Sequence, residues 1–266
     1  MKIAILGTGN LGKSIANGLI TNNAITSLYL TKRNISSIQK FGEHKNVHLT
    51  SSNTEAVAQS DILIFAVQPS HFELVLEEVA PLLNDKHVVI STVTGFEISK
   101  IEKSIGAHQF IIRAMPNTAI AVGKSMTCLC SNAAGEKRIK VAEAIFNRLG
   151  HSMIISETQM QAATVVCASG IAFWMRLIRA TTQAAIQLGF DAKEAQELAM
   201  HTCEGAANLL ISSGNHPEEE IDHVTTPRGC TIEGLNEMEH KGLSSSLIQG
   251  MVSSFHKISH IKTNQT

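Results

Sequence analysis

Two stretches of the chain contain residue types and spacings that could do chemistry. The first is Gly7-Thr8-Gly9-Asn10-Leu11-Gly12, a GxGxxG pattern that directly follows the apolar run KIAIL and opens a helical pattern. In that context the first glycine makes a tight turn, the second lets a pyrophosphate approach the backbone, and the third lets the helix pack on the strand. The N–H groups of the helix start would face the phosphates. The pattern therefore predicts a dinucleotide-binding turn rather than a purely structural glycine turn.

The end of the second predicted strand indicates which nicotinamide cofactor binds. Sites for NAD usually place Asp or Glu about 20 residues after the glycines, but the first acidic residue here is Glu43. The strand ends instead in Thr31-Lys32-Arg33-Asn34. Lys32 or Arg33 could pair with a 2′-phosphate, which a carboxylate would repel. These residues favour NADPH, with NADH as an alternative; in the plainer interpretation both cations only face solvent.

The second stretch is VTTPRGCTIEG, from Val224 to Gly234, which predicts a tight turn that leads directly into a helix. Backbone N–H groups of Gly229, Cys230 and Thr231 at that helix start could hold a carboxylate. The alternative is an ordinary helix start with Thr231 as the N-cap residue.

The helical half of the chain offers few proton donors. Between Met160 and Phe190 the sequence has no Lys, His, Asp or Glu. Reduction of an imine can proceed without such a donor, because the substrate can arrive already protonated on nitrogen and needs mainly to be positioned. A threonine hydroxyl in the second stretch could then hydrogen-bond the ring nitrogen. Motifs of metalloproteases, serine hydrolases and P-loop proteins are absent, and no metal site is predicted.

Repeated strand–helix patterns would position the first stretch. Apolar, β-rich runs alternate with amphipathic segments over residues 1–156, which predicts a dinucleotide-binding domain of the α/β class, built on a doubly wound, Rossmann-like and mostly parallel sheet. The expected strands are residues 2–6, 27–31, 62–67, 87–92 and 110–114, with further strands at 125–130 and 152–155.

Strand patterns stop after residue 156, and residues 157–266 are predicted to form an all-helical domain for substrate binding and dimerisation. One long helix is expected over 158–188 and a second from the capping box Asp191–Glu194 to Gly214, followed by a short helix and two more. The first is apolar on more than one face, so it must be covered by its own domain or by a partner subunit. This favours a homodimer.

Composition argues against nucleic-acid and membrane binding and favours a reducing compartment. Of the 266 residues 44% are apolar and the formal charge is −1, which gives no electrostatic basis for binding nucleic acid or an anionic membrane. The start shows no leader pattern, and no stretch is expected to come near the roughly 20 apolar residues that a membrane span needs. Five cysteines without CxxC spacing fit reduced thiols in a cytoplasmic protein.

Taken together, the chain resembles the pyrroline-5-carboxylate reductase family, whose members make proline by reducing a cyclic imine. The motifs that carry the resemblance are spread over nearly the whole sequence. They are GTGNLG, AVQP (66–69), STVTG (91–95), RAMPNT (113–118), SGIAF (169–173), ISSGNHP (211–217) and TTPRGCTIEGL (225–235).

The resemblance implies a role for each matching position. Gly7, Thr8, Gly9, Asn10, Leu11 and Gly12 would hold the pyrophosphate, and Thr31, Lys32, Arg33 and Asn34 would lie by the adenosine ribose with Asn53. Ala66, Val67, Gln68, Pro69 and Thr92 would line the nicotinamide side. Asn117 would lie close to the substrate, Thr226, Gly229, Cys230 and Thr231 would take its carboxylate, and Thr231 would also act on the ring nitrogen. Dimers, in some members rings of dimers, are implied as well.

Four positions depart from the family pattern, and two alternative functions remain. Arg228 stands where the family has a glycine, Gln68 where it usually has Lys, and Ala119 and Ile171 where it has prolines. A two-domain hydroxyacid dehydrogenase is one alternative, although its catalytic lysine is missing from the long helix. A non-catalytic NADP-binding regulator is the other, and Arg228 is the feature that favours it.

Overall fold

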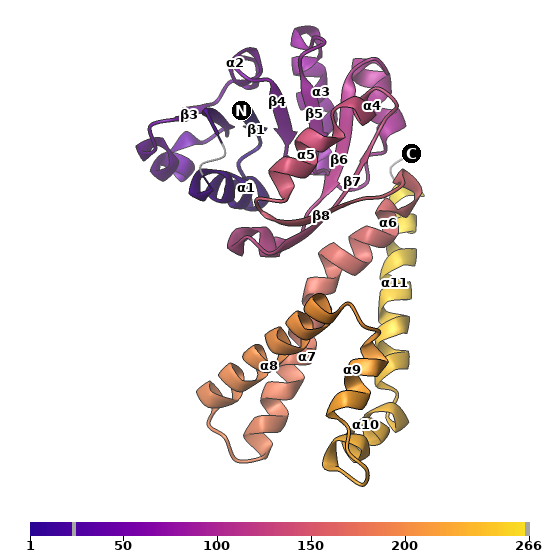
Figure 1. Cartoon of the computed structure of the whole chain (residues 1–266). Coiled ribbons are helices and arrows are strands. Elements are labelled where there is room, and N and C mark those ends of the chain that lie inside the picture. Colours follow the sequence, from indigo (N-terminus) through magenta and orange to yellow (C-terminus); the bar gives the residue numbers. More distant parts are fainter. Residues whose placement is uncertain (23–24, 264–266) are drawn as a thin grey trace. The chain divides into compact units, whose positions relative to one another are not determined.

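The computed structural model describes residues 1–22 and 25–263, and the chain divides into two compact units. The first contains residues 1–169 together with the end of the chain from Ile258, and the second contains residues 170–257. Figure 1 shows the elements of both units along the chain.

The first unit is built on an eight-stranded sheet in the order β3-β2-β1-β4-β5-β6-β7-β8. All pairings are parallel except that of β6 with β7. The first six strands thus have the doubly wound order 3-2-1-4-5-6, which confirms the predicted fold class. The strands are β1 (Lys2–Leu6), β2 (Ser27–Thr31), β3 (Val47–Thr50), β4 (Ile62–Phe65), β5 (Val88–Ser91), β6 (Phe110–Met115), β7 (Ser125–Ser131) and β8 (Gly150–Ile154).

Helices cover both faces of this sheet and bury its alternating side chains. One face packs against α1 (Asn10–Thr21) and α5 (Ile139–Phe146), and the other against α2 (Asn53–Ala58), α3 (Pro69–Val79) and α4 (Ile98–Ile105). Ile3 and Ile5 of β1 point to the first face while Ala4 and Leu6 point to the second. Burial on both faces explains why these strands are nearly continuous apolar runs.

The helical stretch after the sheet is not the single helix that the sequence predicts. It consists of α6 (Met160–Ala163), a π-helical segment (Thr164–Ser169) and α7 (Gly170–Gln187). Periodicity in apolar residues does not distinguish these forms, because a π-helical turn inserts a residue without removing the apolar pattern. The N-terminal part of the first unit, residues 1–169, ends with this π-helical segment.

The second unit contains the remaining helices. α8 (Ala192–Ser213) begins at the predicted capping box of Asp191 and Glu194 and ends at Gly214, whose φ is 69°. It is followed by α9 (Pro217–Val224), α10 (Cys230–His240) and α11 (Leu243–Thr263), the last of which extends into the first unit.

One part of the chain is more apolar than the sequence analysis expects. Residues Glu157–Gln187 are long and apolar enough to cross a membrane by length and composition alone. The prediction that no stretch approaches this composition is therefore too strong. Core helices of water-soluble proteins meet the same criterion, so it is weak evidence for a membrane span.

Candidate functional site

The glycine-rich turn lies between β1 and α1, where the order of the strands reverses. Gly7 has a φ of 95°, and a Cβ atom there would lie 2.5 Å from Cγ1 of Val67. A Cβ atom on Gly12 would lie 2.4 Å from the carbonyl oxygen of Gly7. Both positions therefore require glycine, and Gly9 is the N-cap residue of α1, with no side-chain cap bond to the first N–H groups of the helix. In doubly wound proteins this place binds phosphate groups.

A cavity of about 680 Å³ opens beside this turn. It brings together most of the predicted cofactor residues: Gly7, Thr8, Gly9, Thr31, Lys32, Arg33, Asn34, Asn53, Ala66, Val67 and Gln68. It is also lined by five residues that sequence reasoning missed: Ser51, His71, Leu74, Val75 and Glu78. Four of the five, His71, Leu74, Val75 and Glu78, lie on α3, where no motif marks them; only the position of α3 beside the cavity reveals them.

Thr31 connects the turn to the end of β2. Its hydroxyl oxygen accepts a hydrogen bond from the Gly7 N–H (3.1 Å) and donates to Oδ1 of Asn53 (2.8 Å). Its carbonyl oxygen accepts from the N–H and the hydroxyl of Thr8, at 2.9 and 3.0 Å. Thr31 and Thr8 are both buried. The shape of the glycine turn thus depends on side-chain bonds as well as on the glycines.

Lys32 and Arg33 supply positive charge to the wall of the cavity. Within the described part of the chain neither side chain takes part in an ion pair. Both are therefore available to an anionic ligand, as the sequence analysis expects for a 2′-phosphate.

Five predicted cofactor residues do not line the cavity. Asn10, Leu11 and Gly12 form the first turn of α1, and Pro69 is the first residue of α3. Thr92 is buried, and its hydroxyl donates to the Phe65 carbonyl oxygen at 2.8 Å. Their roles toward the cofactor stay predictions.

Asn117 forms hydrogen bonds through both polar atoms of its side chain and through its backbone N–H. Its Oδ1 accepts from the Ala119 N–H (3.0 Å), its Nδ2 donates to the Cys167 carbonyl oxygen (3.2 Å), and its own N–H donates to Oγ of Ser125 (3.1 Å). It is buried. The contacts make Asn117 a residue that joins β7 to the π-helical segment, and its contact with substrate stays a prediction.

The predicted carboxylate site lies in the second unit, at the start of α10. Gly229 is the N-cap residue and has no side-chain cap bond, and Thr231 is the second residue of the helix. The alternative in which Thr231 is the N-cap is therefore wrong. A Cβ atom at Gly229 would lie 2.4 Å from Oγ1 of Thr226. The turn accordingly needs glycine there, and the first N–H groups of α10 have no side-chain partner of their own.

Comparisons with known proteins agree with this geometry. A family model described as "Pyrroline-5-carboxylate reductase dimerisation" matches residues 157–261, and one described as "NADP oxidoreductase coenzyme F420-dependent" matches residues 2–95. Pyrroline-5-carboxylate reductase 2 of Dictyostelium discoideum is 41% identical, over 97% of this chain and 92% of the relative. Pyrroline-5-carboxylate reductase 1 of the same organism is 42% identical over 99% of the chain, which spans 50% of that longer protein.

Solved structures of pyrroline-5-carboxylate reductases are also similar to this chain. A pyrroline-5-carboxylate reductase from Coxiella burnetii has a TM-score of 0.92 at 28% identity and covers 97% of each chain. The Plasmodium falciparum pyrroline carboxylate reductase, solved with NADP bound, has a TM-score of 0.87 at 25% identity and covers 98% of each chain.

A doubly wound sheet with a glycine turn at its switch point and cations beside the adjoining cavity defines a dinucleotide-binding oxidoreductase. The helical remainder matches one dimerisation domain, and relatives match along nearly the full length. The chain belongs to the pyrroline-5-carboxylate reductase family, as the sequence motifs predict.

Proposed function

We propose that the protein reduces L-Δ1-pyrroline-5-carboxylate to L-proline with NADPH, in proline biosynthesis. The observation that carries this is the match to a pyrroline-5-carboxylate reductase over 97% of the chain, combined with the cavity around the glycine turn. NADPH supplies the hydride when it is bound. Lys32 and Arg33 would pair with its 2′-phosphate, which makes NADPH a better ligand than NADH.

The chain's own residues would position the imino acid rather than transfer a proton to it. The N–H groups of Gly229, Cys230 and Thr231 would hold the substrate carboxylate, with Thr226 beside them. The Thr231 hydroxyl would hydrogen-bond the ring nitrogen and orient the C=N carbon. Fixed donors of this kind can supply most of the acceleration, since they need not reorganise during the reaction.

The chain forms homo-oligomers through its dimerisation domain. We infer that the basic unit is a dimer, that dimers can join into rings, and that the protein acts in the cytoplasm without a membrane or nucleic-acid partner. Five free cysteines support a reducing compartment.

We also place the functional domain boundary between residues 156 and 157, supported by the start of the dimerisation match at residue 157.

Steady-state oxidation of NADPH tests the function. We expect turnover with pyrroline-5-carboxylate and none with ketoacids, and in the reverse direction none with hydroxyacids. Turnover of hydroxyacids would favour the dehydrogenase alternative. NADPH binding without turnover of any of these substrates would favour the regulator.

A further inference from the structure

Glu78 is an acidic residue in a cavity that we expect to bind a phosphorylated cofactor. It lies on α3, is exposed, and lines the same cavity as Lys32 and Arg33. One of its carboxylate oxygens, Oε2, accepts a hydrogen bond from Nδ2 of Asn53 at 2.8 Å. No motif in the sequence marks this residue.

The Glu78 bond fixes the direction of the bonds beyond it. An ionised carboxylate only accepts, so Asn53 must turn its NH2 group toward Glu78 and its Oδ1 toward Thr31. The Thr31 hydroxyl then donates to Oδ1 at 2.8 Å, and its oxygen remains free to accept from the Gly7 N–H at 3.1 Å. If the Asn53 amide were reversed, Nδ2 and the Gly7 N–H would both donate to the Thr31 oxygen, and Thr31 would lose its acceptor.

We propose that Glu78 is a positioning residue for the dinucleotide, acting through Asn53 and Thr31 on the first glycine of the phosphate-binding turn. The inference rests on the proposed function only in assuming that this cavity holds the cofactor. The four residues come from α3, α2, β2 and the turn after β1, so the chain of bonds links four segments that line the cavity.

The positioning role and the charge of Glu78 have opposite effects on binding. Loss of the bond would leave Asn53, Thr31 and the glycine turn less well ordered. These residues would contact the part that NADP and NAD have in common, so the binding of both dinucleotides would weaken. Loss of the negative charge would reduce repulsion of the 2′-phosphate, and so strengthen NADP binding alone. Comparing the two dinucleotides therefore separates the effects.

The experiment measures the Kd of NADP⁺ and of NAD⁺ by calorimetry on the full-length protein, without imino acid. We expect Glu78→Ala to raise the Kd of NAD⁺ about tenfold, the effect of one charge-assisted hydrogen bond. The Kd of NADP⁺ should rise by a smaller factor, because repulsion of the 2′-phosphate is lost as well. Glu78→Gln keeps an acceptor oxygen but loses the charge, so the Kd of NAD⁺ should stay within about twofold of wild type and the Kd of NADP⁺ should not rise. Glu77→Ala is the matched control, because it removes an exposed carboxylate from the same helix outside the cavity.

Two results would overturn the proposal: equal Kd values for Glu78→Ala and Glu77→Ala, or tighter binding of NADP⁺ with an unchanged Kd of NAD⁺ in Glu78→Ala. If Glu78→Ala does not fold, Asn53→Asp provides a second test. It should weaken binding by placing two carboxylates together, and Glu78→Gln in the same protein should restore binding because the Gln amide can donate to Asp. Failure of the proposed function would appear separately, as intact dinucleotide binding without reduction of pyrroline-5-carboxylate.

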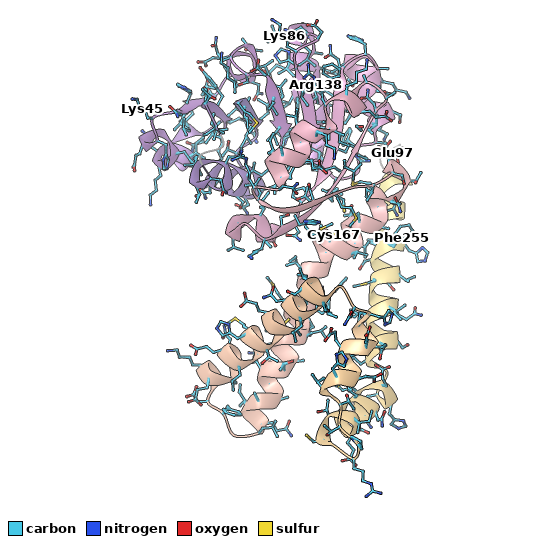
Figure 2. The ribbon with its side chains drawn as sticks, in the orientation of Figure 1. Lys45, Lys86, Glu97, Arg138, Cys167 and Phe255 are labelled. Atoms are coloured by element: carbon cyan, nitrogen blue, oxygen red, sulfur yellow. The ribbon has the colours of Figure 1, made fainter. Side chains whose placement is uncertain are left out.

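A second and independent observation concerns two cysteines that lie far apart in the sequence. Cys128 is buried in β7 and Cys167 is half-buried in the π-helical segment, and their sulfur atoms are 3.9 Å apart. Figure 2 labels Cys167. Its backbone carbonyl oxygen accepts the bond from Asn117. The hydrogen bond with Cys128 lowers the pKa of the Cys167 thiol to about 7, against the opposing effect of burial, and the same bond raises the pKa of Cys128.

We infer that Cys128 and Cys167 form a reversible disulfide when the protein meets a peroxide. The Cys167 thiolate attacks one oxygen of hydrogen peroxide and releases hydroxide, which gives a sulfenic acid. The Cys128 sulfur then attacks the Cys167 sulfur, and water leaves as the bond forms. Two thiols are oxidised and one peroxide is reduced to two waters. The sulfurs must approach by roughly 2 Å, since a disulfide bond is about 2.05 Å long.

Peptide mapping of the peroxide-treated, full-length protein tests this. We expect a cross-linked Cys128–Cys167 peptide that disappears with dithiothreitol, that is absent in Cys128→Ser, and that persists in the control Cys203→Ser. Its rate of formation should rise with pH through about 7, because the thiolate of Cys167 is the nucleophile. Oxidation confined to the exposed Cys230, or a rate that does not change with pH across this range, would overturn the inference.

Discussion

Arg228, in the turn before α10, has a backbone conformation that is unfavourable for any residue with a side chain. Its φ is 58°, and among the described residues it is the non-glycine residue with a positive φ. This angle costs an ordinary residue on the order of 1–2 kcal/mol, and glycine much less. Arg228 stands at a position where the family has glycine, and the structure shows that the turn takes a left-handed angle there.

Replacing Arg228 by glycine should therefore stabilise the protein. We expect Arg228→Gly to raise the free energy of unfolding by about 0.5–1 kcal/mol, because the relief of strain exceeds the added entropy of the unfolded chain. Urea unfolding of wild type and variant measures this. Arg228→Ala is the control: it removes the same charge but keeps the strained angle, so it should show no gain. A gain in both variants would assign the effect to charge instead.

Thr231 is the residue on which the proposed chemistry depends most directly. Loss of one oriented hydrogen bond to the ring nitrogen should lower kcat on the order of 10²-fold in Thr231→Ala. Thr231→Ser keeps the hydroxyl and should retain most of the activity. The measurement is kcat at saturating NADPH and pyrroline-5-carboxylate. Full activity in the alanine variant would remove Thr231 from the mechanism.

Lys32 and Arg33 should determine the preference between cofactors. Replacing both by alanine should raise the KM for NADPH on the order of tenfold while the KM for NADH changes little, because the 2′-phosphate is absent from NADH. Kinetics with each cofactor provide the comparison. Unchanged values for both would show that the two cations only face solvent.

At the scale of elements, the sequence predicts the strands that follow the repeated strand–helix pattern and misses a short strand that lacks an apolar run. Seven of the eight strands are recognisable from the sequence, and for β1, β4 and β5 the reason is that buried parallel strands are apolar runs. β3 is missed, since its four residues VHLT include an exposed histidine and resemble a loop. The cavity around the glycine turn is largely predictable from its glycines and cations. Glu78 is not, because only tertiary packing brings α3 to the cavity.

A polar contact that no sequence pattern indicates holds three elements of the first unit together. The buried guanidinium of Arg113 in β6 bonds Oε1 of Glu157 at 2.8 Å, and the same oxygen accepts from the N–H of Ile98 at the start of α4 at 2.7 Å. The exposed fractions of the two side chains are 6% and 33%. The contact therefore joins the sheet, α4 and the turn that leads into α6.

Removing Glu157 should leave the Arg113 charge buried without this partner. We expect Glu157→Ala to lower the free energy of unfolding by about 2 kcal/mol, less than for a fully buried pair because Glu157 is partly exposed. Thermal and urea unfolding measure the loss. Glu136→Ala removes an exposed carboxylate from the same unit and should change stability by less than about 0.5 kcal/mol. Equal effects in the two variants would contradict the structural role of this pair.

At the scale of the molecule, the second unit exposes more apolar surface than an isolated helical domain can keep in water. Only Gly170 and Thr182 are buried in α7, and only Ala195 and Ala199 in α8. Large apolar side chains lie exposed on this unit: Trp174, Met175, Leu209, Ile211 and Ile248. Large exposed apolar side chains in this number, on helices with so few buried residues, indicate an interface. It agrees with the dimerisation family that matches these residues.

A charge within this surface should therefore shift the protein toward monomer. Met175, which is 61% exposed, should tolerate aspartate in the folded monomer, whereas burial of that carboxylate in an interface would cost several kcal/mol. We expect sedimentation velocity to show a smaller species for Met175→Asp at micromolar concentration. Val122→Asp is the matched control, because Val122 is 75% exposed on the first unit, outside the dimerisation match. If Met175→Asp sediments like wild type while Val122→Asp does not, the interface lies on the first unit instead.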